Sequence, residues 1–244
     1  MEADSEAVRA QVRERYGRTA RTVRAEACCG PGCCTPSDYS PEELTTAPAG
    51  SFLGEGSGNP VRHADLRAGE VIVDLGSGAG VDAFLAAARV GPGGRAIGVD
   101  MTPEMVALAR TLAKEAGAQN VEFREGIIER LPIADGAADV VLSNCVINLS
   151  PDKAAVFREA FRILRRGGRL VVSDIVQERQ LLVLDDDCGC VANAMQRAEY
   201  LATIHAAGFE DIAILEDRPW RTGPGGVDAS SITLRATKPR EVNG

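Results

Sequence analysis

The chain carries seven cysteines among its 244 residues, and thiols are its most chemically distinctive side chains. Cys145 lies in the segment SNCVINLSP and Cys190 in the segment CGCVANA, far apart along the chain. Four more cysteines form the cluster CCGPGCC at residues 28–34. Thiolates bind soft metals and metalloids, and a pair of thiols can close to a disulfide and be reduced again. The cysteines therefore predict ligation of a soft element or redox chemistry.

Charge and composition limit the partners of these thiols. The formal net charge is -8 and no run of Lys and Arg interleaves with aromatic residues, so we expect no nucleic-acid substrate. The N-terminal segment is charged and the chain has no run of about 18 apolar residues, so we expect a soluble, cytoplasmic protein without membrane contact. We also expect a monomer that acts on a small molecule. Because cytosolic thiols stay reduced, ligand or redox roles are favoured over a disulfide framework.

From residue 71 onward, short apolar runs alternate with segments of helical periodicity. The expected strands cover residues 71–75, 95–100, 121–123, 138–144, 169–175, 211–216 and 230–237. The expected helices cover residues 81–90, 103–117, 152–164 and 195–208. This alternation predicts an α/β fold with a doubly wound, mostly parallel seven-stranded sheet and helices on both faces. The last two strands are expected to complete the sheet as an edge pair.

Glycine and proline mark the expected ends of the helices. Thr102 and Pro103 suit an N-cap and a first helical position, and Gly117 and Gly167 fall where helices should stop. Near the N-terminus, residues 4–16 predict an amphipathic helix with Gly17 as its C-cap.

The rest of the N-terminal part has a different composition. Residues 28–60 are rich in Gly, Pro, Ser and Cys, which favours turns over regular elements. We divide the chain into an N-terminal helix and cysteine-rich cap (1–64), a core (65–180), a C-terminal part that completes the sheet and the substrate site (181–237), and a tail (238–244).

The segment VDLGSGAG joins an expected strand to an expected helix. The strand reaches Asp74 and runs into Gly76, Gly78 and Gly80, which let a ligand approach the backbone, while the following helix offers free amide groups. The third glycine of a dinucleotide fingerprint would fall on Val81, so the spacing does not match nicotinamide cofactors.

The next expected strand ends at Asp100. A carboxylate at this position can accept hydrogen bonds from ribose hydroxyls, and the apolar side chain of Met101 suits one face of an adenine ring. The alternative is that Asp100 only caps the helix that begins at Pro103.

Together these motifs resemble the class I S-adenosylmethionine-dependent methyltransferase domain over about residues 65–215, with VDLGSGAG as its first motif and GVDMTPEM as its second. The resemblance implies S-adenosylmethionine as cosubstrate. It also implies that Ile128 and Glu129 flank the adenine, the alternative being a solvated loop. Asn144, at the end of the fourth expected strand, is expected beside the cosubstrate.

A fuller resemblance covers about residues 8–215. SNCVINLSPDK, CGCVANA, the VRERYG helix and the GNPV region are similar to the arsenite S-adenosylmethionine methyltransferases. This implies methyl transfer to arsenite and methylarsenite, with mono-, di- or trimethylated products, and consumption of an external thiol reductant of the glutathione or thioredoxin type.

The chemistry of arsenic agrees with this resemblance. Trivalent arsenic prefers thiolates and keeps a lone pair, which is the nucleophile. If Cys145 and Cys190 hold the As(III) substrate beside the sulfonium methyl, the transfer needs positioning and no general base. Transfer leaves arsenic pentavalent, and thiolates can restore the trivalent state by closing a disulfide. Cys28 or Cys29, in the cluster at 28–34, would then supply a third ligand or a disulfide partner. We predict no structural metal.

The sequence departs from the family at one position. The family pattern has a cysteine in a GCGNP element, where this chain has Ser57. Three explanations remain open: the other thiols suffice, a cysteine of the 28–34 cluster substitutes, or the chain is a variant with altered substrate or an engineered change.

Other interpretations of the cysteines also remain open. Cys145 could be a small buried hydrophobic residue, and the cluster at 28–34 could bind structural zinc, although its spacing differs from the usual CxxC. The chain could then methylate a small organic metabolite, with activity that survives Cys145→Ser. It could also bind arsenite without turnover.

Overall fold

A seven-stranded sheet forms the centre of the protein, as seen in a computed structural model that describes residues 2–21, 38–54, 56–178, 191, 193–220 and 229–240. The strands are β1 (Val71–Leu75), β2 (Arg95–Asp100), β3 (Val121–Glu125), β4 (Ala138–Asn144), β5 (Leu164–Gln177), β6 (Glu210–Trp220) and β7 (Ala229–Thr237). Their order in the sheet is β3-β2-β1-β4-β5-β7-β6. β1 to β5 pair in parallel, whereas β7 pairs antiparallel with β5 and β6. The predicted fold class is confirmed, and the last two strands form the expected pair at the edge, which is antiparallel.

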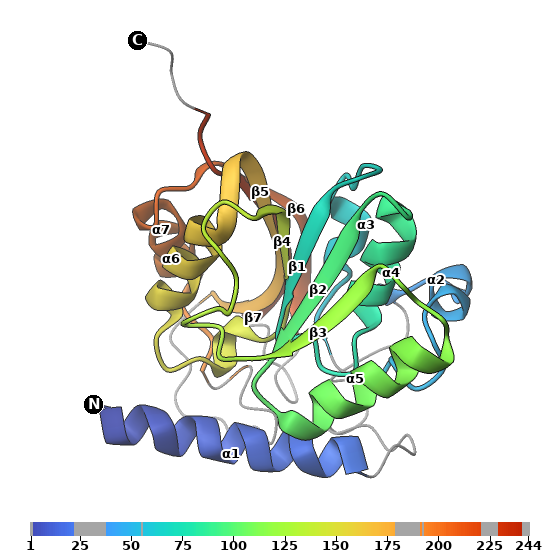
Figure 1. The fold of residues 1–244 in the computed structure, drawn as a ribbon. Helices are drawn as coiled ribbons and strands as arrows, with labels where there is room; N and C mark the ends of the chain where they lie inside the picture. Colours follow the sequence, from blue (N-terminus) through green and yellow to red (C-terminus); the bar gives the residue numbers. More distant parts are fainter. Residues whose placement is uncertain are drawn as a thin grey trace.

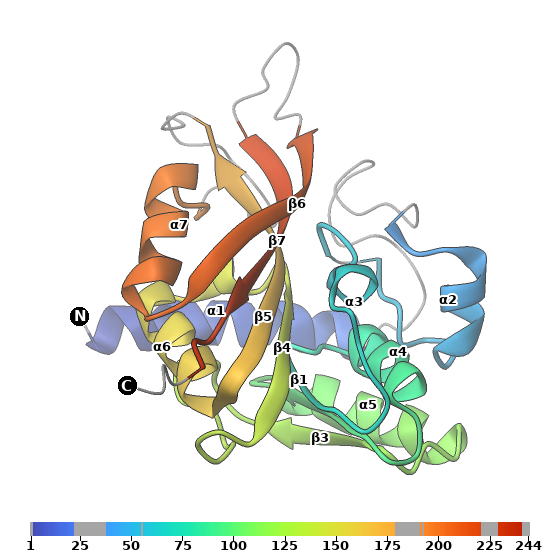
Figure 2. The same cartoon turned by 90° about the horizontal axis from the view of Figure 1, so that it is seen from above.

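Helices cover both faces of this sheet (Figures 1 and 2). They are α1 (Glu2–Arg21), α2 (Pro41–Thr46), α3 (Pro60–His63), α4 (Val81–Val90), α5 (Pro103–Glu115), α6 (Lys153–Ile163) and α7 (Arg197–Ala206), with a 3-10 turn at Ile147–Leu149. α4 and α5 lie on one side of the sheet, and α6 and α7 lie on the other. The central strands β1, β2 and β4 therefore bury both of their faces, which explains why they read as continuous apolar runs.

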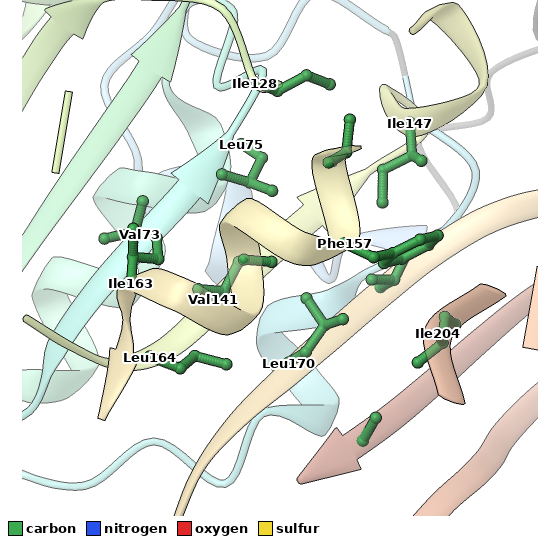
Figure 3. Packing of buried hydrophobic residues seen from close by; sticks show 14 of the residues in the cluster. Val73, Leu75, Ile128, Val141, Ile147, Phe157, Ile163, Leu164, Leu170 and Ile204 are labelled. Atoms are coloured by element: carbon green, nitrogen blue, oxygen red, sulfur yellow. The ribbon is translucent and has the colours of Figure 1, made fainter. Parts of the chain in front are cut away.

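Two hydrophobic cores result from this layering. In one of them, Val73 of β1 and Leu170 of β5 pack in a cluster with Phe157 of α6 and Ile204 of α7 (Figure 3). The other core lies under α4 and α5 and includes Phe84 and Phe123, whose rings lie 5.4 Å apart. The sheet is thus held rigidly from both sides, and its strand ends are fixed platforms for a site.

Helix α1 differs from its prediction. It continues through Gly17 to Arg21, so Gly17 is not a C-cap. A Cβ atom at Gly17 would lie 3.1 Å from the carboxylate of Glu104, at the start of α5. The glycine therefore permits close approach of two helices, which is a long-range cause that local sequence does not reveal.

Two other local predictions also need correction. The region 28–60 was expected to form turns, but α2 forms within it, because Ser40 and Glu43 make a capping box and Pro41 occupies the first helical position. Gly167 ends no helix: α6 ends at Ile163, and Gly167 lies inside β5 with φ +72°. Thr102 and Gly117 do flank α5 as expected. No helix in the described part of the chain is long and apolar enough to span a membrane.

Candidate functional site

A cavity opens at the carboxyl ends of β1, β2 and β4. β1 and β4 are neighbours in the sheet although β2 and β3 lie between them in the sequence, so the strand order reverses direction at this point. Ligands of open α/β sheets bind where the strand order reverses. Nine of the predicted site residues line the cavity: Asp74, Gly76, Gly78, Asp100, Met101, Ile128, Glu129, Asn144 and Cys145. The structure thus brings together residues that the sequence grouped only by motif.

One predicted site residue within the described part of the chain, Gly80, is not part of this wall. Gly80 lies behind it with φ +99°, and a Cβ atom there would come within 2.5 Å of the Phe123 ring. Gly80 therefore packs against Phe123 and does not line the cavity. Cys28, Cys29 and Cys190 lie outside the described residues.

The glycine loop adopts left-handed backbone conformations that glycine tolerates without strain. Gly76 has φ +63°, and a Cβ atom there would lie 2.2 Å from Cγ2 of Val146, the residue after Cys145. Gly78 has φ +52° and has no atom within 4 Å of the position of its missing Cβ. The loop therefore packs against the Cys145 segment at Gly76 and leaves open space at Gly78.

Asp100 braces this loop from the neighbouring strand. Its Oδ2 accepts a hydrogen bond from the Gly78 N–H at 2.9 Å, and its Oδ1 accepts one from the Thr102 N–H at 2.8 Å. Burial raises the pKa of Asp100, although these hydrogen bonds oppose the shift. The N-cap of α5 is Thr102 and not Asp100, and Asp100 also holds the glycine loop through Gly78. A carboxylate has about four acceptor sites, and the Thr102 side chain also bonds to Asp100, so about one site remains for a ligand hydroxyl.

Two further carboxylates lie deeper in the cavity wall. Asp74 lies in β1, one residue before the strand ends at Leu75, and Asp82 lies in the first turn of α4. Burial raises the pKa of Asp82 to about 6. Burial also raises the pKa of Asp74 well above its ordinary value, and the nearby charges of Asp82 and Asp100 add to this shift. A buried acidic wall of this kind favours a cationic ligand.

Asp82 is held by residues from two other parts of the fold. The Tyr39 hydroxyl donates to Asp82 Oδ1 at 2.8 Å, and Asn144 Nδ2 lies 3.1 Å from Asp82 Oδ2 and 3.0 Å from the Tyr39 oxygen. Neither Tyr39 nor Asp82 was predicted as a site residue. Asp82 had a sequence signal, because it is an acidic residue in the first turn after the glycine loop.

The Asn144 side chain is committed to protein partners. Its Nδ2 has two hydrogens for three acceptors, namely Tyr39, Asp82 and the Gly58 carbonyl at 2.9 Å, so one hydrogen is shared. Its Oδ1 accepts from the Ser57 N–H at 3.0 Å. Asn144 therefore lines the cavity while it fixes the 56–58 segment and the acidic wall.

Cys145 follows directly and turns the chain into the cavity. Its φ is +57°, a left-handed conformation that is uncommon outside glycine, and its N–H donates to the Ser173 carbonyl of β5 at 2.8 Å. Ile175 of β5 and Trp220 at the end of β6 also line the cavity. Trp220 was not among the predicted site residues, because its place before a Gly- and Pro-containing segment favoured an apolar anchor over a substrate platform.

Arg9, Val12 and Tyr16 of helix α1 line another side of the cavity. The helix itself runs beside α5 (Figure 1). Arg9 Nη2 lies 3.5 Å from Glu129 Oε1, which also accepts a hydrogen bond from the Ser150 hydroxyl at 2.7 Å. The sequence predicted the helix but not its place in the site.

The wall fits the cosubstrate that the sequence resemblance implies. The open space at Gly78 leaves room for close approach to the backbone, and the buried Ser77 hydroxyl has no hydrogen-bond partner among the described residues. Met101 and Ile128 offer apolar contact, and the carboxylates of Asp74, Asp82 and Asp100 match a sulfonium and an ammonium group.

Comparisons with known proteins agree with this geometry. A family model described as "Methyltransferase domain" matches residues 66–217. The crystal structure of an arsenic(III) S-adenosylmethionine methyltransferase from Chlamydomonas reinhardtii superposes with a TM-score of 0.68 at 31% identity, covering 85% of this chain and 72% of that one.

Curated relatives carry the same description. An arsenite methyltransferase of Halobacterium salinarum is 43% identical over 234 residues, which is 86% of this chain and 59% of that protein. An arsenite methyltransferase of Aquipseudomonas alcaligenes is 44% identical over 162 residues, which is 61% of this chain and 46% of that protein. The chain thus spans about half the length of these curated relatives. It belongs to the arsenite methyltransferase family of class I S-adenosylmethionine-dependent methyltransferases.

Proposed function

We propose that this chain transfers methyl groups from S-adenosylmethionine to As(III) held by the thiolates of Cys145 and Cys190. The observation that carries the proposal is the position of Cys145. It lines the same cavity as the glycine loop and the acidic wall, and the next residue, Val146, packs on Gly76. A thiol-bound atom would therefore lie beside a ligand held by that loop.

The surroundings of Val191 support Cys190 as the second thiol. Val191 follows Cys190 in the chain, is 5% exposed, and its carbonyl accepts a hydrogen bond from Gln177 Nε2 at 3.2 Å. Gln177 ends β5, two residues beyond Ile175 in the cavity wall. The residue next to Cys190 thus lies at the same end of β5 that borders Cys145.

In this mechanism, the side chains of the protein bind the cosubstrate and arsenic and orient them toward each other. The cosubstrate, when bound, supplies an electrophilic methyl group on a positively charged sulfur. Asp74 and Asp82 favour that positive charge, and they favour the neutral thioether product less, which helps exchange after transfer. Cys145 holds arsenic so that its lone pair faces the methyl carbon. Because the nucleophile carries no proton, catalysis depends on positioning and not on a base.

A thiol reductant completes the proposed cycle. Methyl transfer oxidises arsenic from the trivalent to the pentavalent state, and two thiolates that close to a disulfide return two electrons to it. An external thiol of the glutathione or thioredoxin type then reopens the disulfide. We assign the additional protein thiol to Cys28 or Cys29, and we place the reaction, by a monomer, in the cytoplasm, where such thiols are kept reduced.

The test is direct. The protein is incubated with labelled S-adenosylmethionine, arsenite and glutathione, and methylated arsenicals are separated and quantified. We expect product from the wild type and none from Cys145→Ser or Cys190→Ser, while Cys188→Ser, a matched change in the same CGC segment, retains it. Methyl transfer that survives Cys145→Ser would point instead to an organic metabolite as substrate. Arsenite binding without methyl transfer would identify a binding protein.

A further inference from the structure

The conformation of Cys145 needs support from outside the cavity. With φ +57°, the residue lies in a backbone region that side chains rarely adopt, and such a conformation persists only where the surroundings fix it. Cys145 is the first residue of a short turn that continues through the 3-10 segment Ile147–Leu149. The position of the thiol therefore depends on what holds the two ends of this turn.

Both ends are fastened to consecutive residues of β5. At the start of the turn, the Cys145 N–H donates to the Ser173 carbonyl at 2.8 Å. At its end, Asn148 Nδ2 donates to Asp174 Oδ1 at 2.7 Å and to the Ile175 carbonyl at 2.8 Å. The turn is thus pinned along one strand, and that strand also contributes Ile175 to the cavity wall.

The Asp174 carboxylate is itself fixed on its other side. Asp174 Oδ2 accepts a hydrogen bond from the Tyr200 hydroxyl of α7 at 3.0 Å, and Oδ1 accepts a second one from the Ile175 N–H at 3.0 Å. Asn148 is 1% exposed, and Asp174 and Tyr200 are both 0% exposed. These three side chains form a buried network behind the cavity that does not reach solvent.

The hydrogen bonds also settle the orientation of the Asn148 amide. The Ile175 carbonyl can only accept a hydrogen bond, so a flipped amide would direct its own oxygen at that carbonyl. In the observed orientation, Asn148 Oδ1 is buried and has no hydrogen-bond partner among the described residues. A buried acceptor without a partner is unfavourable, so the two donated hydrogen bonds must outweigh it.

We propose that Asn148 is a positioning residue that fixes the Cys145 thiol in the cavity by fastening the Cys145–Leu149 turn to Asp174 and Ile175. This inference rests on the proposed function, because it assigns Cys145 to the substrate. Asn148 acts through the backbone and need not touch arsenic or the cosubstrate.

The test compares three variants in the full-length protein. Asn148→Ala removes both hydrogen bonds to β5. Tyr200→Phe removes only the remote support of Asp174 and keeps the ring in the core, so it serves if Asn148→Ala does not fold. Ser143→Ala is the matched control, since Ser143 is 0% exposed at the same strand end and its hydroxyl has no partner among the described residues.

We expect kcat per folded enzyme to fall about 100-fold in Asn148→Ala, because displacement of a reacting group by about 1 Å can cost that much. Tyr200→Phe should lose about three- to tenfold, which is the smaller effect of loosening a support. The affinity for S-adenosylmethionine should stay within about twofold of wild type in all three, since Asn148 and Tyr200 are not in the cavity wall. Ser143→Ala should keep wild-type kcat.

A readout independent of methylation separates this inference from the proposed function. Alkylation of Cys145 by iodoacetamide, followed by peptide mass spectrometry, should become at least about threefold faster in Asn148→Ala, because the turn opens more readily. The cysteines at 28–34 are the internal reference. Unchanged kcat and unchanged alkylation in both network variants would overturn the inference, as would a loss of total activity in Asn148→Ala that disappears when activity is expressed per folded enzyme. If the wild type yields no methylated arsenic, the proposed function fails, and the alkylation rates alone decide the role of Asn148.

Discussion

The Tyr39 hydroxyl donates a hydrogen bond of 2.8 Å to Asp82, 43 positions away in the chain. Asn144 donates to both partners, so three parts of the fold meet at one point: the N-terminal cap, the start of α4 and the end of β4. Cys145 is the next residue after this point. The contact therefore ties the acidic wall of the cavity to the residue that we assign to the substrate.

Tyr39→Phe should show how much this hydrogen bond contributes to stability and to cosubstrate binding. The ring of Tyr39 packs edge-on against Phe52 at 5.5 Å, and phenylalanine keeps that packing, so only the hydroxyl is lost. We expect the free energy of unfolding in urea to fall by about 1–3 kcal/mol, because buried Asp82 loses a donor. The affinity for S-adenosylmethionine should fall as well. Adding Asp82→Asn should then cost less than it does in the wild type. Equal, additive losses would contradict a direct coupling.

Gly76 and Gly78 provide a matched pair in the glycine loop. Both have positive φ, but a Cβ atom meets Val146 at 2.2 Å in one and nothing within 4 Å in the other. Gly76→Ala should therefore lower the free energy of unfolding by about 3 kcal/mol, from backbone strain plus overpacking. Gly78→Ala should cost only about 1 kcal/mol from backbone strain.

The affinity for S-adenosylmethionine should rank these two variants differently. The methyl group of Gly78→Ala projects into open space at the cavity wall. Binding of S-adenosylmethionine should therefore weaken, and its free energy should change more in this variant than the free energy of unfolding does. Calorimetric titration of the folded protein measures this directly. Equal destabilisation of both variants, or unchanged affinity in Gly78→Ala, would contradict this account of the loop.

The sequence predicted the central strands well for a physical reason. The expected ranges 71–75 and 95–100 coincide with β1 and β2, because strands buried on both faces are continuous apolar runs bounded by polar residues. α2 also had a local signal, the Ser40 to Glu43 capping box, which the composition of the surrounding region obscured. The role of Gly17 had no local signal in the sequence, because its close approach to Glu104 is a contact between helices that are distant in the chain.

The residues at the site also fall into those with a local sequence signal and those without one. Gly76, Gly78 and Asp100 belong to motifs whose spacing reflects local geometry, so the sequence located them. Tyr39 and Asn148 act through hydrogen bonds to residues far away in the chain. Periodicity and spacing contain no information about such partners.

Ser57 is a buried residue whose substitution should not lower the free energy of unfolding. It is 0% exposed, its hydroxyl has no partner among the described residues, and it is not part of the cavity wall. Ser57→Ala and Ser57→Cys should therefore keep the free energy of unfolding or raise it by up to about 1 kcal/mol, since no hydrogen bond is lost. The control is Ser231→Ala, because the Ser231 hydroxyl donates to the Ser57 carbonyl. That variant should lose about 1 kcal/mol. A comparable loss in Ser57→Ala would contradict the prediction.

Asp174 makes stability depend on pH. It is 0% exposed, and burial raises its pKa from 3.8 to about 7 against the opposing hydrogen bonds from Ile175 and Tyr200 and the charge of Lys153. The folded state therefore holds this proton more tightly than the unfolded state does. The contribution to stability is complete below pH 3.8 and is lost as the pH rises to about 7. Asp82, whose pKa is raised to about 6, acts with the same sign.

Urea unfolding at pH 5 and pH 8 measures this effect. Between these values the wild type should lose about 3 kcal/mol through Asp174, at about 1.4 kcal/mol for each pH unit up to 7. Asp174→Asn keeps an oxygen to accept from Asn148 but cannot titrate, so its stability should fall by correspondingly less over the same interval. Parallel pH profiles for the two proteins would mean that Asp174 keeps the same charge across this range. In that case the carboxylate would already be ionised at pH 5 despite its burial.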